Sequence, residues 1–291
     1  MSGSFNSVLV TVLLWLVVRF VRLLPECCVF QFGRTIGSIA FVLAHKHRRL
    51  AFRNLRLAYG DEKSPSEMRR TVLRTFMNMG LNVVDFCRVP WLHGKGFRNC
   101  VRVEGYENLA EALKKGKGAV LLTAHLGSWE LMAAAGAPLG LSLFAIVSST
   151  GDPLVDRFMK RMRESRGYRT LPKHRAVYSV VSRLKQNAVV GILADVSPRH
   201  DGVLVRFFGK VVGATKGPAV FALRSDAPVI PTFIVRLAQP ARHKIIFEKP
   251  VELVKTGDRE TDIAESTQRF HAIIERYVRR YPDQWLWMQK R

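Results

Sequence analysis

The first long apolar segment of the chain covers residues 5–24 and ends at Pro25. Twenty helical residues at about 1.5 Å each reach about 30 Å, the thickness of the hydrocarbon core of a bilayer. Arg19 and Arg22 interrupt the segment near its end, where long basic side chains can reach a polar interface. The pattern therefore predicts a membrane-anchoring helix over residues 1–25, either a short span or an interfacial helix. A cleaved signal peptide fits less well because no Lys or Arg precedes the segment, and a buried globular helix remains an alternative.

A basic segment follows. Five Lys and Arg residues and two His residues lie between Ala44 and Leu57, with no acidic residue among them. Such a flank stays on the cytoplasmic side of a membrane and suits anionic lipid headgroups, so we expect the rest of the chain to face the cytoplasm. The stretch from Cys27 to Ala44 carries one Arg and two Gly residues and predicts an amphipathic helix that packs on the membrane or the core.

Helical periodicity continues to about residue 100. The segment Ser64-Pro65-Ser66-Glu67 combines a Ser cap, Pro at the first helical position and a Glu that completes a capping box. Apolar residues then recur at helical spacing from Met68 to Val83, which indicates a helix facing the core. We therefore expect residues 26–100 to form a helical, membrane-proximal region.

From Val101 onwards, short apolar runs alternate with helix-like stretches. The runs predict buried strands over Ala119–Ala124, Leu143–Ser148, Val189–Ala194, Val229–Val235 and Lys244–Phe247. The other stretches predict helices over Asn108–Lys115, Ser128–Ala137, Pro153–Ser165, Ala176–Lys185, Ala214–Arg224 and about Thr261–Tyr281. Continuously apolar strands that alternate with helices are typical of an α/β fold with a mostly parallel sheet covered by helices. Residues 101–291 are expected to form this core.

Composition adds a large positive charge. The chain has 46 Lys plus Arg against 23 Asp plus Glu, a formal net charge of +23, and its 48% apolar residues exclude a disordered chain. The charge implies a polyanionic partner, which could be nucleic acid, an anionic membrane surface, or an acidic protein or ligand. The apolar N-terminus and the lack of nucleic-acid-binding signatures argue against nucleic acid. The four Cys residues form no C-x-x-C pair and no zinc spacing with His, so we expect no metal site.

Polar residues follow two of the predicted strands, His125 after the first and Asp195 after the third. Ligands of open parallel sheets bind beyond the carboxyl ends of the strands. Glu130 lies five residues after His125, so on one helix the two would be about 140° apart. With a tight turn at Gly127 and Glu130 in the first turn of the next helix, they can meet. Glu130 would then fix the imidazole tautomer while His125 acts as a general base on a hydroxyl. A histidine that only caps a strand end is the alternative.

The segment Ala124-His125-Leu126-Gly127-Ser128-Trp129-Glu130 resembles the H-x4-D/E motif of glycerolipid and lipid A acyltransferases. Its flanking Gly and Trp resemble the lipid A late acyltransferases, the lauroyl and myristoyl transferase family. Further segments similar to that family follow in the family's order over Glu164–Gly167, Leu193–Val196, Gly202–Gly209, Ala227–Pro231 and Tyr281–Trp287. The chain departs from the family pattern at Val196, where Gln is frequent, and at Arg206, where Pro is commoner.

The resemblance implies a membrane-bound O-acyltransferase at the cytoplasmic face of the inner membrane. Such an enzyme moves a fatty acyl chain from an acyl carrier protein thioester to a hydroxyl of a lipid A precursor, with His125 and Glu130 as the catalytic pair and no metal or cofactor. Arg166 is expected to hold a phosphate or the donor's phosphopantetheine, unless it belongs to a solvated basic face. Asp195 is expected to order the site or contact sugar hydroxyls, unless it only caps a turn. Phosphatidylinositol mannoside, a lysophospholipid or an ornithine lipid is the alternative acceptor.

Overall fold

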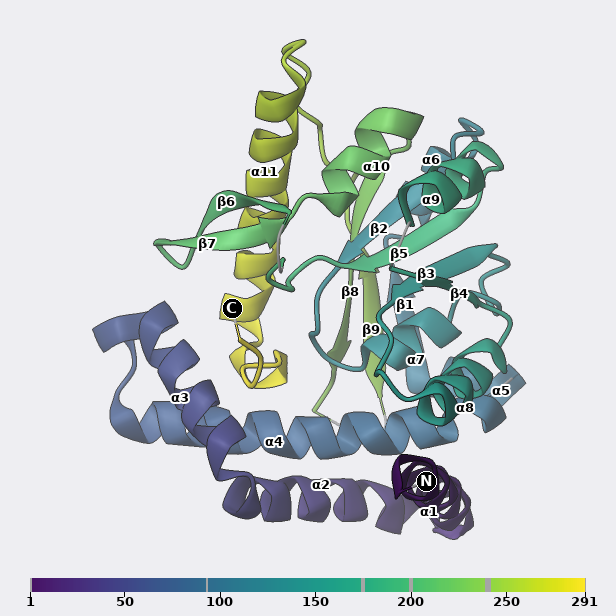
Figure 1. Ribbon diagram of the computed structural model, residues 1–291, viewed down its shortest axis with the longest axis vertical. Helices are drawn as coiled ribbons and strands as arrows, with labels where there is room; N and C mark the ends of the chain where they lie inside the picture. Colours follow the sequence, from purple (N-terminus) through teal and green to yellow (C-terminus); the bar gives the residue numbers. More distant parts are fainter. Residues whose placement is uncertain (1, 93, 174–175, 199–200, 239–241, 291) are drawn as a thin grey trace.

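The computed structural model describes residues 2–92, 94–173, 176–198, 201–238 and 242–290. It contains a seven-stranded sheet with the strand order β1-β9-β8-β2-β5-β3-β4 (Figure 1). The strands are β1 (Val101–Glu104), β2 (Ala119–Thr123), β3 (Leu143–Val147), β4 (Arg169–Pro172), β5 (Val189–Leu193), β8 (Val229–Arg236) and β9 (His243–Phe247). Five neighbouring strands, from β8 to β4, are parallel, whereas β9 runs antiparallel to β8 and parallel to β1. The expected mostly parallel α/β sheet is confirmed.

Helices cover both faces of the sheet, which explains the continuous apolar runs: every residue of β2 and β8 is buried. On one face the core includes side chains of α3 (His45–Tyr59), α4 (Pro65–Arg88), α9 (Ala176–Lys185), α10 (Gly217–Ser225) and α11 (Arg259–Arg280). On the other face it includes side chains of α5 (Gly94–Cys100), α6 (Tyr106–Leu113) and α7 (Trp129–Ala134). The expected capping box begins α4, where the Ser64 hydroxyl accepts from the backbone N–H of Glu67 and the Glu67 carboxylate accepts from that of Ser64.

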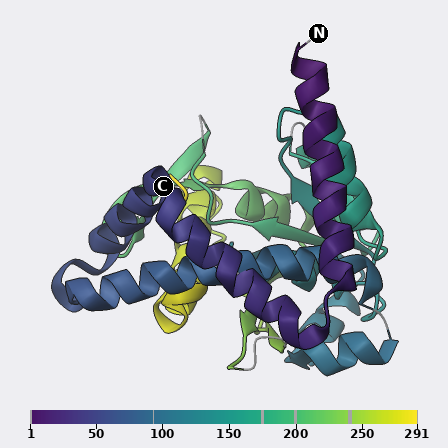
Figure 2. The same cartoon turned by 90° about the horizontal axis from the view of Figure 1, so that it is seen from below.

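The N-terminal helices α1 (Ser2–Leu23) and α2 (Glu26–Leu43) pack beside α4, which α2 crosses at close range (Figure 2). Glycines make this crossing possible. A Cβ atom on Gly37 would lie 2.4 Å from the Phe76 carbonyl oxygen, and one on Gly80 would lie 2.0 Å from the Gly33 carbonyl oxygen. The two helix backbones therefore approach too closely for any larger residue at Gly37 or Gly80.

Helix α1 has one buried and one exposed apolar face. Val18 and Val21 pack with residues of α4 and of α8 (Pro153–Glu164), which include Val84 and Met162. Among the side chains of α1 that the structure describes, the exposed large apolar ones are Val8, Leu9, Val10, Val12, Leu13, Trp15, Leu16, Val17, Phe20 and Leu23. Within the described residues, no single helix satisfies the length and hydropathy criteria for a membrane span, although residues 28–43 and 45–62 satisfy them jointly across a 90° bend. Membrane anchoring by residues 1–25 therefore stays a prediction.

The largest departure from the predicted elements is a β-hairpin. Strands β6 (Gly202–Phe207) and β7 (Lys210–Thr215) pair antiparallel, so the helix expected over 214–224 begins only at Gly217. Phe208 and Gly209 form the connecting turn, and both have positive φ, 49° and 69°. Phe208 is buried, and its backbone N–H donates to the carboxylate of Glu275 at 2.6 Å. Tertiary contacts therefore stabilise a backbone conformation that an aromatic residue rarely adopts.

Candidate active site

The register of two neighbouring strands brings His125 and Asp195 together. β2 and β5 are parallel, and Thr123 lies directly beside Leu193. His125 and Asp195 each come two residues after this matched pair, at the carboxyl ends of their strands. The backbone N–H of Ala194 donates to the Thr123 carbonyl at 2.8 Å, which continues the pairing beyond the last matched residues. The two side chains thus meet at the sheet edge where α/β proteins bind ligands.

Asp195 is buried, with 5% of its surface exposed, and its carboxylate accepts hydrogen bonds from His125 and Trp285. Oδ1 accepts from Nδ1 of His125 at 2.9 Å, and Oδ2 accepts from the backbone N–H of His125 at 3.0 Å and from Nε1 of Trp285 at 2.8 Å. A carboxylate only accepts, so the proton of the neutral imidazole lies on Nδ1 and Nε2 keeps its lone pair. The described residues provide no hydrogen-bond partner for Nε2, and His125 lines an open cavity. This is the arrangement of a general base.

The turn after His125 requires glycine, as the sequence predicted. Gly127 has φ of 59°, and a Cβ atom there would lie 2.1 Å from the carbonyl oxygen of Ile234. Side chains other than glycine are excluded both by the left-handed conformation and by this contact. The turn separates the strand that carries His125 from helix α7, whose first turn contains Glu130.

The structure gives His125 a different carboxylate partner from the one expected. The carboxylate of Glu130 accepts from Arg163 instead, at 2.6 Å from Nη2 and 3.1 Å from Nε, and from the Tyr168 hydroxyl at 3.3 Å. The predicted orientation of the imidazole by Glu130 is therefore corrected: Asp195 is the carboxylate on Nδ1. The reason is geometric, because Asp195 faces His125 across adjacent strands, whereas α7 presents Glu130 to Arg163 of α8.

Arg163 and Tyr168 form a small polar network with Glu130 at the cavity wall. Burial, the largest single influence, acts to lower the pKa of the Arg163 guanidinium, but the hydrogen bonds and the negative charge of Glu130, with smaller contributions from Tyr168 and Asp156, together raise that pKa. Burial and the neighbouring Glu130 raise the pKa of the Tyr168 hydroxyl well above its usual range. Arg163 therefore stays a cation and Tyr168 a neutral donor at any physiological pH.

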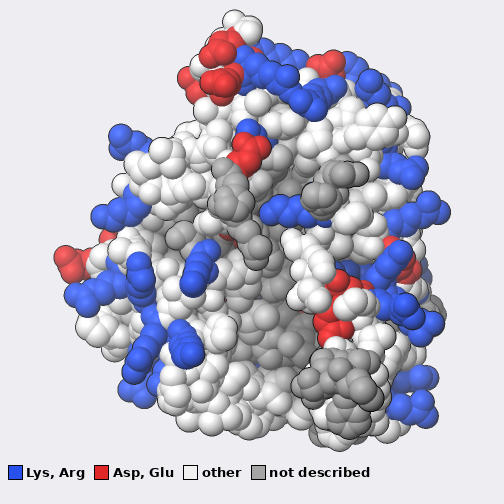
Figure 3. All heavy atoms as spheres, in the orientation of Figure 1, with Lys and Arg blue, Asp and Glu red and all other residues white. Residues whose placement is uncertain are grey.

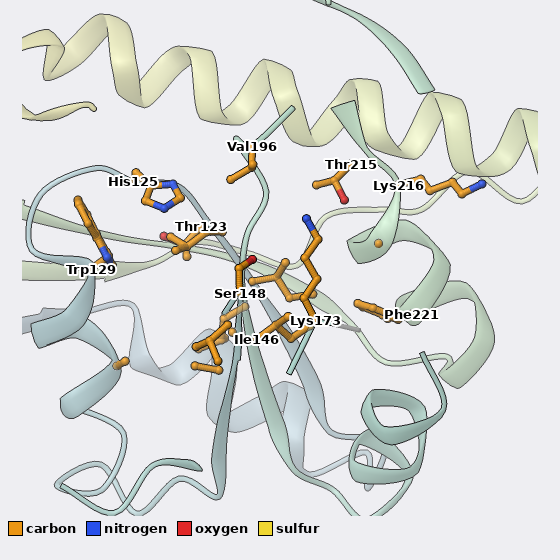
Figure 4. Close-up of a pocket in the computed structure, with 18 of the residues that line it drawn as sticks. Thr123, His125, Trp129, Ile146, Ser148, Lys173, Val196, Thr215, Lys216 and Phe221 are labelled. Atoms are coloured by element: carbon orange, nitrogen blue, oxygen red, sulfur yellow. The ribbon is translucent and has the colours of Figure 1, made fainter. Parts of the chain in front are cut away.

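A cavity of about 1130 Å³ opens in front of His125. One side is apolar and lies on the sheet face covered by α7; this apolar wall consists of Leu121, Met132, Ala133, Leu143, Ala145 and Gly191. Besides Arg163, the described lining outside this wall includes four cations, called the basic wall below: Lys173, Lys216, Arg224 and Arg259. Two acidic residues, Asp201 and Glu260, lie among them, and Asp201 forms an ion pair with Lys216. In Figure 4 the side chain of Lys173 extends towards Thr215, with His125 and Trp129 on the opposite side of the opening.

Gly191 leaves space in the apolar wall. In the sheet it lies between Leu121 of β2 and Ala145 of β3, in one row across three strands. A Cβ atom at position 191 would come no closer than 3.9 Å to any atom outside its immediate neighbours. The small residues in this row therefore leave space for a ligand against the sheet.

Arg166 is not brought together with His125. It lies between α8 and β4, before β4 begins, and so at the sheet edge opposite to the carboxyl ends of the strands. The described lining of the cavity does not include it, whereas Arg163, one helical turn earlier, lines the cavity. Sequence reasoning noted the basic run from Arg157 to Arg175 but did not select Arg163 within it.

The C-terminal segment contributes a contact that sequence reasoning also missed. Trp285 is 1% exposed and packs edge-on against Trp287, with ring centroids 4.6 Å apart. Its indole N–H donates to Asp195, and the backbone N–H of Leu286 donates to the carbonyl oxygen of His125 at 3.0 Å. Core packing and support of the site are therefore combined in one segment. Across the described parts of the chain, no three His, Cys, Asp or Glu side chains are arranged to hold a metal ion.

Comparisons with known proteins place these features in context. The sequence profile of the family described as bacterial lipid A biosynthesis acyltransferase matches residues 4–291. The chain is 22% identical over 282 residues to the lipid A biosynthesis lauroyltransferase of Escherichia coli and 24% identical to its lipid A biosynthesis palmitoleoyltransferase; each match covers 96% of this chain and 88% of the relative. A phosphatidylinositol mannoside acyltransferase of Mycobacterium tuberculosis is 36% identical over 153 residues, which is 50% of this chain and 48% of that protein.

Proposed function

The chain belongs to the bacterial lipid A biosynthesis acyltransferase family, and from that premise we propose that it moves a fatty acyl chain from an acyl carrier protein thioester to a hydroxyl of a lipid A precursor. The acyltransferase activity follows from the family. The donor, the acceptor and the roles of individual residues are the proposal. The observation that carries it is the pairing of His125 with buried Asp195, with Nε2 turned to a cavity that has an apolar wall.

His125 acts as the general base in this reaction. Nε2 takes the proton of the acceptor hydroxyl as its oxygen attacks the thioester carbonyl carbon, which gives a tetrahedral oxyanion. The carbon–sulfur bond then breaks, and the imidazolium returns the proton to the departing thiolate. The products are the ester and the free thiol of the donor. Asp195 holds the imidazole in the required tautomer and stabilises the imidazolium. The sequence had predicted this role for Glu130.

In the proposed reaction, Glu130 positions the side chain of Arg163. Its hydrogen bonds with Nε and Nη2 of Arg163 fix the guanidinium at the cavity wall, and Tyr168 supports the pair from the core. A fork-shaped pair of this kind fixes both partners more firmly than a single hydrogen bond. Arg163 and Glu130 therefore define the shape of the cavity between Nε2 of His125 and the apolar wall.

The two walls of the cavity suit two different parts of the substrates, the hydrocarbon chain and the phosphate groups. The apolar wall can take the hydrocarbon of the donor because Gly191 leaves space there. The basic wall can take phosphate groups, which both a phosphopantetheine arm and a phosphorylated glycolipid carry. Lys173, which extends into the cavity, is the first candidate for this contact (Figure 4). Arg166, at the opposite edge of the sheet, has no part in this arrangement.

A second acceptor class remains a candidate. The Mycobacterium tuberculosis relative is named for phosphatidylinositol mannoside, and its identity to this chain is higher, although the match covers half of each protein. The His125–Asp195 chemistry serves either acceptor, because both offer a hydroxyl to the same base. The acceptor therefore has to be identified by the lipid product rather than by the site.

We also propose that α1 and α2 attach the protein to the cytoplasmic face of the inner membrane. Exposed apolar side chains on α1 are joined by Ile39, Val42 and Leu43 on α2. The neighbouring helix α3 begins with His45-Lys46-His47-Arg48-Arg49, and Lys and Arg outnumber acidic residues on the face seen in Figure 3. Apolar insertion combined with basic residues is the pattern of interfacial attachment to anionic lipid. Flotation with vesicles of anionic and of neutral lipid tests this, and equal recovery from both would contradict the electrostatic part.

Lipid mass spectrometry tests the function. Lipids from cells with and without the gene are compared, and purified protein is incubated with lauroyl-loaded acyl carrier protein and a lipid A precursor. We expect lipid A without the gene to lack one secondary acyl chain, and the purified protein to add one to the precursor. Unchanged lipid A together with altered phospholipids or mannosides would show that the acceptor belongs to the second class. Absence of acyl transfer to every acceptor would refute it.

A further inference from the structure

A buried polar cluster lies behind the turn that follows His125. Asp85 of α4, Arg236 at the end of β8 and His243 at the start of β9 are 3%, 7% and 1% exposed. Nη2 of Arg236 donates to Oδ2 of Asp85 at 2.6 Å, and Nε2 of His243 lies 3.2 Å from the same oxygen. The antiparallel register of β8 and β9 sets Arg236 directly beside His243. None of the three lines the cavity described above.

The side chain of Asn82 links this cluster to the turn after His125. Asn82 lies one helical turn before Asp85 on α4 and is 8% exposed. Nη2 of Arg236 donates to its Oδ1 at 2.8 Å, and its Nδ2 donates to the carbonyl oxygen of Gly127 at 2.7 Å. The Arg236 hydrogen bond fixes which end of the Asn82 amide faces the turn. The amide can therefore present only its N–H side to Gly127.

The same arginine reaches Gly127 by a second route, through its backbone. Gln284 accepts from the backbone N–H of Arg236 at 2.7 Å and donates to its carbonyl oxygen at 2.9 Å. The backbone carbonyl of Gln284 accepts from the N–H of Gly127 at 3.0 Å. Both polar groups of Gly127, two residues after His125, are thus held by groups bound to Arg236.

The buried ion pair between Asp85 and Arg236 is not explained well by a contribution to folding stability. Removing two charges from water costs about as much as their attraction returns, and apolar replacements are often as stable. Here the charges fix the amide that holds the turn after His125. From these contacts we propose that Asp85, Arg236 and Asn82 form a positioning device for His125, which keeps Nδ1 against Asp195 and Nε2 on the reacting hydroxyl. This inference rests on the proposed function for its effect on turnover, but its geometric part does not.

Substitution of Asn82 tests the inference. Asn82→Asp has nearly the same shape and keeps an oxygen for Arg236 but loses the donor to Gly127, and Asn82→Ala removes both contacts. Asn108→Ala is the matched control, because Nδ2 of Asn108 also donates to a backbone carbonyl, that of Phe247 at 2.9 Å, far from the turn. Turnover of lauroyl-loaded acyl carrier protein with a lipid A precursor is measured together with the proton NMR signal of the His125 Nδ1–H. Asn82→Asp keeps the test decisive if Asn82→Ala does not fold.

We expect both Asn82 variants to lose about 10- to 100-fold in kcat with KM changed less than about twofold, since a displaced base affects the chemical step more than binding. The Nδ1–H signal should broaden or vanish in both, whereas Asn108→Ala should keep the signal and the wild-type kcat. Wild-type kcat and Nδ1–H signal in Asn82→Asp would overturn the inference, as would equal effects of Asn108→Ala. If the wild-type protein itself transfers no acyl group, the proposed function fails, and the Nδ1–H signal alone decides on the positioning device.

Discussion

Replacement of Asp195 by Asn is the most informative change at the site, because it alters the charge and hydrogen bonding of the carboxylate with little change in shape. Oδ2 of Asp195 accepts from the backbone N–H of His125 and from the indole N–H of Trp285, whereas Oδ1 accepts from Nδ1 of His125. An amide has one oxygen and one NH2 group. The oxygen of Asn should therefore take the place of Oδ2, which turns the NH2 group towards the imidazole.

This orientation of the amide forces the wrong tautomer on His125. Facing an NH2 donor, Nδ1 has to accept, so the ring proton moves to Nε2 and the lone pair needed for proton abstraction is lost. The imidazolium formed in the reaction also loses its neighbouring negative charge. We expect kcat to fall by about 10²- to 10⁴-fold, which corresponds to about 3–5 kcal/mol in the activation barrier, with KM nearly unchanged.

The assay is the steady-state release of the donor thiol from lauroyl-loaded acyl carrier protein, with a lipid A precursor as acceptor. Asp262→Asn is the matched control, since Asp262 is also buried and accepts hydrogen bonds, from the backbone N–H and the hydroxyl of Thr256. Its kcat should stay at the wild-type value. A folded Asp195→Asn variant with kcat within about threefold of wild type would refute the tautomer argument.

Three other substitutions test the apolar wall, the indole of Trp285 and the buried charge of Asp85. Gly191→Leu places a side chain in the apolar wall, so the ratio of palmitoyl to lauroyl transfer should fall at least about tenfold in a competition assay, and an unchanged ratio would place the acyl chain elsewhere. Trp285→Phe removes the indole hydrogen bond to the carboxylate of Asp195. Such a bond is worth about 1.5 kcal/mol, so kcat should fall about tenfold. Full activity of this variant would show that the indole contributes only packing. Burial acts to raise the pKa of Asp85, but Arg236 and His243 prevail and lower it. Asp85 therefore contributes stability above about pH 4 that is lost as the pH falls further, and Asp85→Asn should flatten the acid limb of a plot of Tm against pH, whereas parallel limbs would contradict this.

The predicted sheet was recovered because its signals are local. Mostly apolar runs of four to seven residues identify strands that lie between two layers of helices, and β2, β3, β5, β8 and β9 were all predicted within one residue of their observed ends. The hairpin was missed because its turn depends on Phe208 at positive φ, a conformation that only its surroundings stabilise. β1 and β4 were missed as well, since four-residue strands at the sheet margins carry little pattern.

The site was predicted in part because two of its residues also carry a local signal. His125 and Asp195 were both identifiable as polar residues at the ends of apolar strands. Their pairing was not, because it depends on the register of β2 against β5, strands that lie about 70 residues apart in the chain. The short spacing between His125 and Glu130 favoured the wrong partner, although α7 presents Glu130 to Arg163. Nearness in sequence therefore misassigned a contact that the sheet register decides.

The role of His125 as the general base is tested most directly by the turnover of a folded His125→Ala variant. Without the imidazole, the acceptor hydroxyl has no base at the carboxyl end of β2, whereas the cavity, the apolar wall and the contacts of Glu130 with Arg163 remain. Acyl transfer from lauroyl-loaded acyl carrier protein to a lipid A precursor is measured for the variant and for the wild-type protein at equal concentration. We expect transfer by His125→Ala to fall at least about 10³-fold below wild type. Turnover within about tenfold of wild type would contradict His125 as the base.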